Sequence, residues 1–233
     1  MFKWIFKWLF RLAFLSVLLV IVFLLSLNSI LRVLIEHNIR AQTGMDAEIG
    51  RVEVGWTKPT FEIRDLKIYN PPSFGGTPFL DVPEIHIEYD RMALLKSELH
   101  LKLVRLNVAE LDIVRNRKGD LNIFAVGNAP KKNRGIVVPS FKKETGYDFQ
   151  GIDFLNISYN KEKFIDLQNP HNNREQTVGL QNCVVPDVKS ARDLAGLLVI
   201  IDLRSNHFFD PLMAGQFNSA PLKSVLDLMG AAL

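Results

Sequence analysis

Residues 99–113 read LHLKLVRLNVAELDI, and this stretch decides the fold. Apolar and polar side chains alternate along it, with one change of phase between Leu103 and Val104 and another between Val108 and Leu111. A period of two residues places alternate side chains on opposite faces of a β-strand. The stretch therefore predicts a long strand with one apolar and one polar face, and the apolar face has to be covered.

Similar alternation extends to both sides of this strand. It appears in residues 52–56, 61–68, 85–89, 155–159 and 177–185. Two shorter strands are predicted at residues 121–124 and 164–167, and a slip of phase after Asp65 is typical of a β-bulge. The fold class is therefore mainly β with a few α-helices. Its centre is a curved antiparallel sheet of about eight or nine strands.

Helices are predicted after the last strand. Ser190 and Asp193 have the spacing of a capping box, and residues 194–201 carry apolar side chains at helical spacing. Residues 221–229 repeat this pattern. We expect these short C-terminal helices to cap the sheet. Residues 126–147 are rich in proline, lysine and glycine and read as a loop-like excursion inside one domain.

The N-terminal segment differs from the rest of the chain. No ionisable side chain occurs between Leu12 and Leu31, and three cations precede this stretch, Lys3, Lys7 and Arg11. Twenty residues at about 1.5 Å each span the ~30 Å core of a bilayer. The pattern predicts a single-pass transmembrane helix at 12–31, a cytoplasmic N-terminus at 1–11 and an external domain at 32–233. A cleaved signal peptide is the alternative, but the apolar run is long and no small-residue cleavage site follows it.

Charge and composition narrow the function classes. The formal net charge is +3, which equals the three N-terminal cations, so the residues after them sum to zero. A neutral domain does not bind nucleic acid through phosphate neutralisation, and we expect no nucleic-acid partner. Cys183 is the single cysteine, so no intramolecular disulfide is possible.

Local spacing suggests no catalytic chemistry. The five histidines show no metal-ligand spacing, and His86 and Glu88 share only the polar face of a strand. Ser140 and Lys143 match a Ser-x-x-Lys pattern, but they lie in the loop-like excursion. We predict no catalytic residue, no metal site, no cofactor and no enzyme, although distant residues could still converge in the fold.

The order of several motifs resembles that of a known family. These are Thr43-Gly44-Met45, Glu48-Ile49-Gly50-Arg51-Val52, Phe61 to Ile68 followed by Asn70-Pro71 and Phe74, Phe79-Leu80-Asp81-Val82, and a turn from Gly119 to Asn122. After an N-terminal span, this order is similar to the start of AsmA-family envelope proteins, which belong with the repeating β-groove lipid-transfer proteins. The resemblance is clearest over residues 40–124 and extends to Leu167.

The resemblance implies a taco-like sheet with an apolar groove, held in the periplasm by a bacterial inner-membrane anchor. It implies that the groove carries phospholipid acyl chains in lipid transport or envelope maintenance. The expected groove-lining residues are Val52, Val54, Trp56, Phe61, Ile63, Ile85, Ile87, Leu99, Leu101, Leu103, Leu111, Ile113, Leu155 and Ile157. A sheet of this size gives a groove of about 40 Å, shorter than in bridging members of the family.

Three functions stay open on the sequence. The first is a membrane-anchored lipid-groove protein. The second is a non-enzymatic accessory subunit that docks on a larger envelope complex through edge strands or the transmembrane helix, with the apolar face filled by its own side chains. The third is an envelope hydrolase or binding protein whose site is assembled from distant residues.

Overall fold

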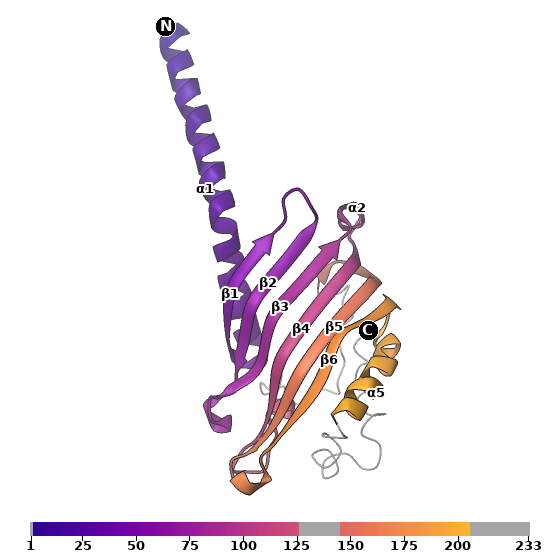
Figure 1. Cartoon of the computed structure of the whole chain (residues 1–233). Coiled ribbons are helices and arrows are strands. Elements are labelled where there is room, and N and C mark those ends of the chain that lie inside the picture. The colour runs from indigo at the N-terminus through magenta and orange to yellow at the C-terminus, as the bar shows by residue number, and fades with distance from the viewer. Residues whose placement is uncertain (1, 126–144, 206–233) are drawn as a thin grey trace.

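The computed structural model describes residues 2–125 and 145–205, and it has one open sheet with a long helix at its N-terminus (Figure 1). The helices are α1 (Phe2–Thr43), α2 (Arg91–Leu95), α3 (Asn122–Ala125) and α5 (Ala195–Arg204), with short 3₁₀ turns η1 (Pro72–Phe74), η2 (Pro170–Asn172) and η3 (Ala191–Leu194). The strands are β1 (Asp46–Val54), β2 (Thr60–Tyr69), β3 (Pro78–Tyr89), β4 (Glu98–Arg115), β5 (Asp148–Asp166) and β6 (Arg174–Val188).

The sheet is mixed, not antiparallel throughout as we predicted. Its strand order is β1-β2-β3-β4-β5-β6, and all neighbours are antiparallel except β4 and β5, which are parallel. Parallel neighbours need a connection of a dozen or more residues, and residues 116–147 are long enough for this. The loop-like excursion predicted at residues 126–147 therefore fits a long connection between the parallel strands β4 and β5.

The structure has six strands in its described residues, fewer than the sequence predicted. The segments 155–159 and 164–167 are parts of one long strand, β5, in which the alternation changes phase. Residues 121–124 are not a strand either: Leu121 makes an isolated bridge with Arg115, and α3 follows at once.

The phase slip after Asp65 is not a β-bulge, because neither strand gains a residue. Ile49 pairs with Leu66 and Arg51 with Arg64, so the register is the same on both sides of Gly50 and Asp65. Asp65 has a positive φ of 54°. A Cβ on Gly50 would lie 2.9 Å from the Asp65 Cβ, so glycine allows the two strands to approach here.

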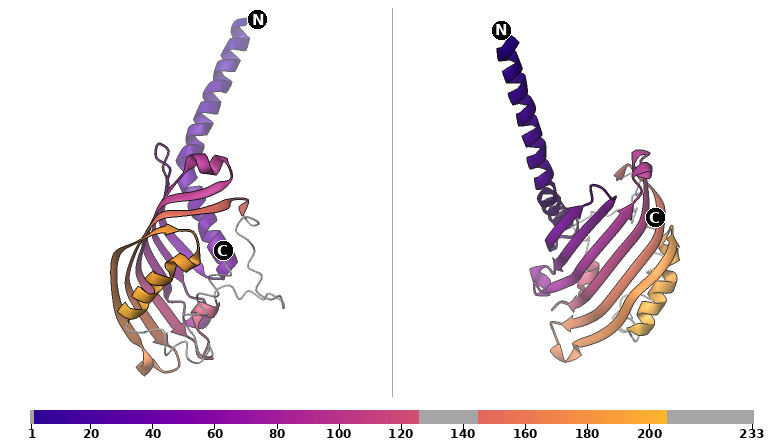
Figure 2. Two further views of the ribbon diagram at one scale, coloured as in Figure 1. Left: turned by 90° about the vertical axis from the view of Figure 1, so that its right-hand side faces the viewer. Right: turned by 45° about the horizontal axis from the view of Figure 1, so that its top comes forward.

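Helices lie at two edges of the same face of the sheet. The C-terminal part of α1 packs Leu31, Ile35 and Ile39 against buried residues of β1, β2 and β3. At the other edge, Leu197 of α5 is buried with Tyr159 and Leu180. Figure 2 shows that the sheet curves around both contacts, and we call this side the concave face and the other side the convex face.

The predicted helix after β6 is confirmed as α5. It is preceded by η3, where the Ser190 backbone N–H donates to the Asp193 carboxylate at 2.7 Å. The second predicted helix, 221–229, and most of the predicted excursion lie outside the described residues.

The long helix α1 includes the segment predicted to cross a membrane. Among the residues that the structure describes, no helix is found to be both long and apolar enough to span a membrane.

Candidate functional site

The concave face carries apolar side chains in rows that run across the strands. Strand pairing aligns one residue from every strand, because directly paired residues share a face. The first row is Val52, Ile63, Ile85, Leu106, Ile157 and Cys183. The second row is Val54, Phe61, Ile87, Val104, Leu155 and Val185. Each row therefore crosses all six strands without a charged residue.

The two rows are covered at the β1 edge and less so in the middle of the sheet. Val52 and Ile63 are 2% and 7% exposed, since α1 packs beside them. In the middle strands, Ile85, Ile87 and Val104 are only half-buried. The rows thus form an apolar stripe that is partly accessible between α1 and α5.

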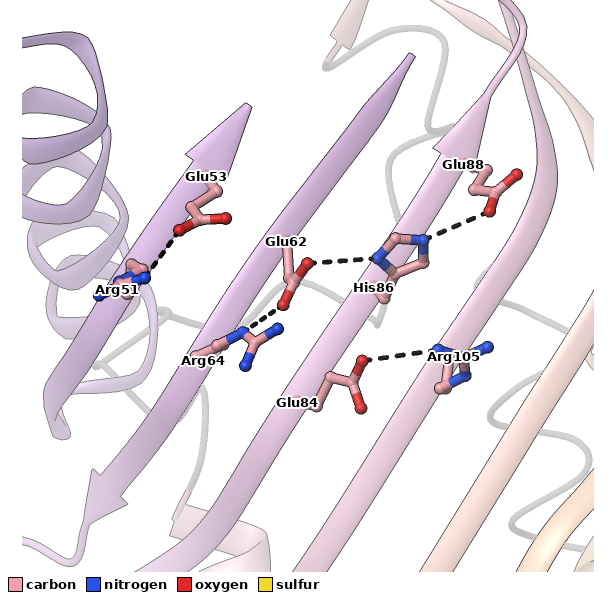
Figure 3. Close-up of polar contacts among 8 residues, drawn as sticks. All are labelled: Arg51, Glu53, Glu62, Arg64, Glu84, His86, Glu88 and Arg105. Atoms are coloured by element: carbon pink, nitrogen blue, oxygen red, sulfur yellow. Dashed lines mark hydrogen bonds and ion pairs between the residues drawn. The ribbon is translucent and has the colours of Figure 1, made fainter. Parts of the chain in front are cut away.

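The convex face is polar at the matching positions. The row between the two apolar rows begins Glu53, Glu62, His86, Arg105. Its members and their neighbours form ion pairs along and across the strands, which Figure 3 shows. His86 Nδ1 lies 3.5 Å from Glu62 Oε2, and Arg105 Nη1 lies 3.6 Å from Glu84 Oε1.

Glu62 is the centre of this charged row. Burial alone would raise the pKa of Glu62, but hydrogen bonds and charge from Arg64 and His86 outweigh it, so the pKa lies below its ordinary value. His86 also lies 3.4 Å from Glu88, as expected for two residues on one polar face. The convex face therefore carries a network of exposed and half-exposed ion pairs.

The structure brings most of the sequence-predicted groove residues onto the concave face. Eight of them stand in the two rows: Val52, Val54, Phe61, Ile63, Ile85, Ile87, Leu155 and Ile157. Leu111 packs beside α5, and Ile113 is 0% exposed in a separate cluster with Leu121 and Phe164. Leu99 is half-buried opposite Phe149, and Leu101 pairs with Tyr89.

Two predicted groove residues lie elsewhere. Leu103 pairs with Glu88 and Phe154 on the convex face. The reason is that the register of β3 and β4 shifts between Leu101 and Leu103, whereas the sequence suggested a change of phase only after Leu103. Trp56 lies beyond the end of β1, in the turn to β2, and its side chain is 58% exposed.

Sequence reasoning left out Val104 and Leu106, which take the central places in the two rows. Their alternation was visible in the sequence. Assigning them to the same face as Ile85 and Ile87 required the pairing of β3 with β4, which no single strand encodes.

Asn70, in the β2–β3 turn, and Asn122, after β4, hold one end of the sheet together. Asn122 is fully buried, and its Nδ2 donates to Asn70 Oδ1 and to the Asp112 carbonyl, both at 2.8 Å. The Val114 N–H donates to Asn122 Oδ1 at 3.0 Å. Because these contacts satisfy every polar atom of a buried amide, both asparagines have a structural role.

Two buried carboxyl groups have raised pKa values. Burial raises the pKa of Glu162 to about 7, although Tyr159 donates a hydrogen bond to it at 2.9 Å. Burial and the nearby Glu110 raise the pKa of Asp112 to about 6. Glu162 pairs with Leu111 and so lies on the concave side, near α5, whereas Asp112 pairs with Lys163.

A polar cavity of about 410 Å³ lies between the starts of β4 and β5 and the end of β6. His100 Nε2 lies there, 2.8 Å from Asp153 Oδ1. The described residues that line it include no serine, threonine or cysteine, and neither Glu162 nor Asp112 reaches it. Within the described part of the chain, no group of three or more His, Cys, Asp or Glu residues could hold a metal ion.

The protein is thus a mainly β protein with one open sheet, an apolar concave face and a long N-terminal helix. The model of the AsmA family matches residues 3–156, which is more than half of the chain, and the chain belongs to the AsmA family. This is a family of envelope proteins, is not known as enzymatic, and suggests an envelope-related lipid function in general terms. No curated protein matches the chain, and no solved structure matches it.

Proposed function

We propose that this protein binds phospholipid acyl chains along the concave face of its sheet and serves lipid transport or envelope maintenance. The observation that carries the proposal is the pair of apolar rows, half-buried in the middle strands and free of charged residues. Six strands about 4.8 Å apart give rows of about 24 Å. That is longer than the ~15 Å that one acyl chain covers in half of a ~30 Å bilayer core.

The affinity in this proposal comes from removing acyl CH₂ groups from water, at roughly 0.8 kcal/mol each. An apolar stripe offers no donor or acceptor that distinguishes one chain from another. We therefore expect binding of several phospholipids with little preference for the acyl chain.

The proposal includes an inner-membrane anchor at residues 12–31, with the N-terminus in the cytoplasm and the bulk of the chain in the periplasm. This part rests on the sequence, in which Lys3, Lys7 and Arg11 precede a stretch without ionisable side chains. We further propose that the protein is not an enzyme, since the carboxyl groups with strongly raised pKa values lie outside the polar cavity.

Neighbouring residues on β4 give a matched test of the lipid site. In Val104→Asp, the carboxylate lies in the middle of the apolar stripe, whereas in Leu103→Asp it lies on the convex face beside Glu88. Losing contact with two CH₂ groups weakens binding about tenfold. The measurement is the phospholipid retained per full-length chain, determined by mass spectrometry after purification.

We expect Val104→Asp to retain much less phospholipid than the wild type, and Leu103→Asp to retain the same amount. Ile87→Asp, on the neighbouring strand, is a second concave-face variant, and circular dichroism checks that each variant keeps its sheet. Equal retention in both β4 variants would refute the proposed site.

A second candidate function is an accessory subunit of an envelope complex, and one observation favours it. In the described residues β6 pairs with a neighbour on one side only, so its outer edge presents backbone groups for a further strand. We propose that a protein partner could add a strand there. Chemical cross-linking in intact membranes, with a cysteine introduced at the exposed Val184 of Cys183→Ala protein, tests this edge.

A further inference from the structure

One end of the sheet carries a group of exposed apolar side chains outside the strands. The turn after β1 holds Trp56, which is 58% exposed, and α2 holds Met92 and Leu95, which are 65% and 80% exposed. Tyr147, just before β5, is 39% exposed. We call residues 55–59, 90–97 and 147 the rim.

The rim is one connected structure, although its parts are far apart in the sequence. Arg91 Nη2 donates to the Trp56 carbonyl at 2.7 Å and so joins α2 to the β1–β2 turn. The Asp148 N–H donates to the Ser97 carbonyl at 2.9 Å, which holds the start of β5 beside α2. These hydrogen bonds hold the segments that carry the exposed apolar side chains together at one end of the sheet.

The described residues at the opposite end of the sheet form no such group. In the described turns 70–77, 116–121 and 167–173, no large apolar side chain is exposed, and Phe74 and Leu121 are 4% and 2% exposed. The same sheet therefore buries apolar residues at one end and presents them at the other. Exposed apolar groups of this kind mark a contact surface.

The charge of the rim favours an anionic partner. Residues 55–59 and 90–97 contain Lys58, Arg91 and Lys96 but only one carboxylate, Asp90. The Asp90 carboxylate caps α2, accepting from the Met92 N–H at 2.8 Å. In the described residues no ion pair joins Lys58, Arg91 or Lys96 to a carboxylate, so the three cations can meet an outside anion.

The position of the rim points to a membrane and not to another protein. The N-terminal half of α1 extends beyond the sheet at the end that carries the β1–β2 turn and α2, and these lie at the level of the C-terminal half of α1 (Figures 1 and 2). A bilayer that holds residues 12–31 would meet this end of the sheet. Tryptophan and cationic side chains around apolar residues suit the interface between headgroups and acyl chains.

We propose that the rim rests in the surface of the same bilayer that holds α1, with Trp56, Met92 and Leu95 among the acyl chains just below the headgroups and Lys58, Arg91 and Lys96 at anionic headgroups. This inference rests on the proposed membrane anchor. It places the second apolar row, which begins at Val54 directly before the β1–β2 turn, on the side of the sheet nearest the membrane, where lipid passes between bilayer and sheet.

Fluorescence of single tryptophans tests the contact. Full-length protein with Trp4→Phe and Trp8→Phe keeps Trp56 alone, and a second protein carries Leu95→Trp with all three native tryptophans replaced by phenylalanine. Each is reconstituted into vesicles of phosphatidylethanolamine and phosphatidylglycerol with or without brominated acyl chains. We expect a blue-shifted emission, a loss of intensity with brominated lipid, and protection from aqueous iodide for both probes.

The control is His171→Trp in the tryptophan-free background, which places the probe at the opposite end of the sheet. It should respond to iodide and not to bromine. Iodide quenching of Trp56 and Leu95→Trp equal to that of the control overturns the proposal. So does bromine quenching of Trp56 alone, which a lipid bound on the concave face would produce, and so does protection from iodide without bromine quenching, which a protein partner would produce.

Two further measurements on the same samples separate this inference from the proposed function. Flotation with the vesicles reports the anchor, and retained phospholipid per chain reports the concave site. A floating, lipid-loaded protein with a water-exposed rim contradicts the rim alone. A quenched rim without retained phospholipid contradicts the lipid site alone. Protein that does not float contradicts both the anchor and the rim.

Discussion

Leu103 and Val104 are neighbours in sequence, but they belong to surfaces of opposite character. Val104 stands between Ile87 and Leu155 in an apolar row on the concave face, whereas Leu103 stands between Glu88 and Phe154 on the convex face. On the concave face, helices bury the apolar rows at the edges of the sheet. On the convex face, the described residues form ion pairs along and across the strands. This single-layer sheet therefore buries only part of its concave face, and the half-buried part of that face is the candidate site.

The largest expected difference between the faces is in stability. Ile63 is 7% exposed in the cluster under α1, while the next residue, Arg64, is on the convex face. Ile63→Ala leaves a cavity and should lower the free energy of unfolding by about 2–5 kcal/mol. Arg64→Ala removes a partly exposed ion pair and should lower the free energy of unfolding much less. Urea unfolding of the full chain in mild detergent compares them, and similar losses would contradict the assignment of the two faces.

The next effect concerns the buried carboxyl group on the concave side. The pKa of Glu162 rises from 4.5 to about 7 on folding, so the folded protein keeps a proton that the unfolded chain releases in this range. The free energy of unfolding should therefore fall as pH rises from about 4.5 to about 7, by at most about 3 kcal/mol. The Glu162→Gln variant keeps an acceptor for the Tyr159 hydroxyl and should lose this part of the slope.

Thermal unfolding between pH 4 and pH 8 measures the slope. A Glu162→Gln variant with an unchanged slope would show that Glu162 is not held protonated beside α5.

The smallest effect is expected from the charged row itself. The pKa of Glu62 is lowered on folding, so its contribution to stability is present above pH 4.5 and is lost as pH falls through the folded value. Because the pairs are partly exposed, Glu62→Gln should cost no more than about 1 kcal/mol at pH 7. High salt should reduce this difference in stability between the wild type and Glu62→Gln. A larger, salt-independent loss would indicate a structural role for the ion-pair network of the convex face.

The sequence predicted the class of fold because its signals were local. Alternation in β1 to β4, the capping pair at Ser190 and Asp193, and the apolar spacing of α5 each depend on residues close in the chain. The family was also visible in the order of short motifs. The structure then explains two of them: Asn70 and Asn122 are hydrogen-bonded to each other across 52 positions.

What the sequence could not supply was pairing between distant segments. The parallel alignment of β4 with β5 and the common register at Gly50 and Asp65 depend on contacts between strands. The same is true of the candidate site: Leu103 and Trp56 have the right chemistry for a groove, but pairing and strand ends place them elsewhere. Val104 and Leu106 became central only when β3 and β4 were aligned.

The most direct test of the central claim is site-specific photo-cross-linking in intact cells. A benzophenone amino acid replaces Val104 or Leu103 in the full-length chain, and phospholipid adducts are detected by mass spectrometry after irradiation. The account predicts adducts at Val104 on the concave face and background levels at Leu103 on the convex face. Equal labelling at the two positions, or no labelling at Val104, would contradict it.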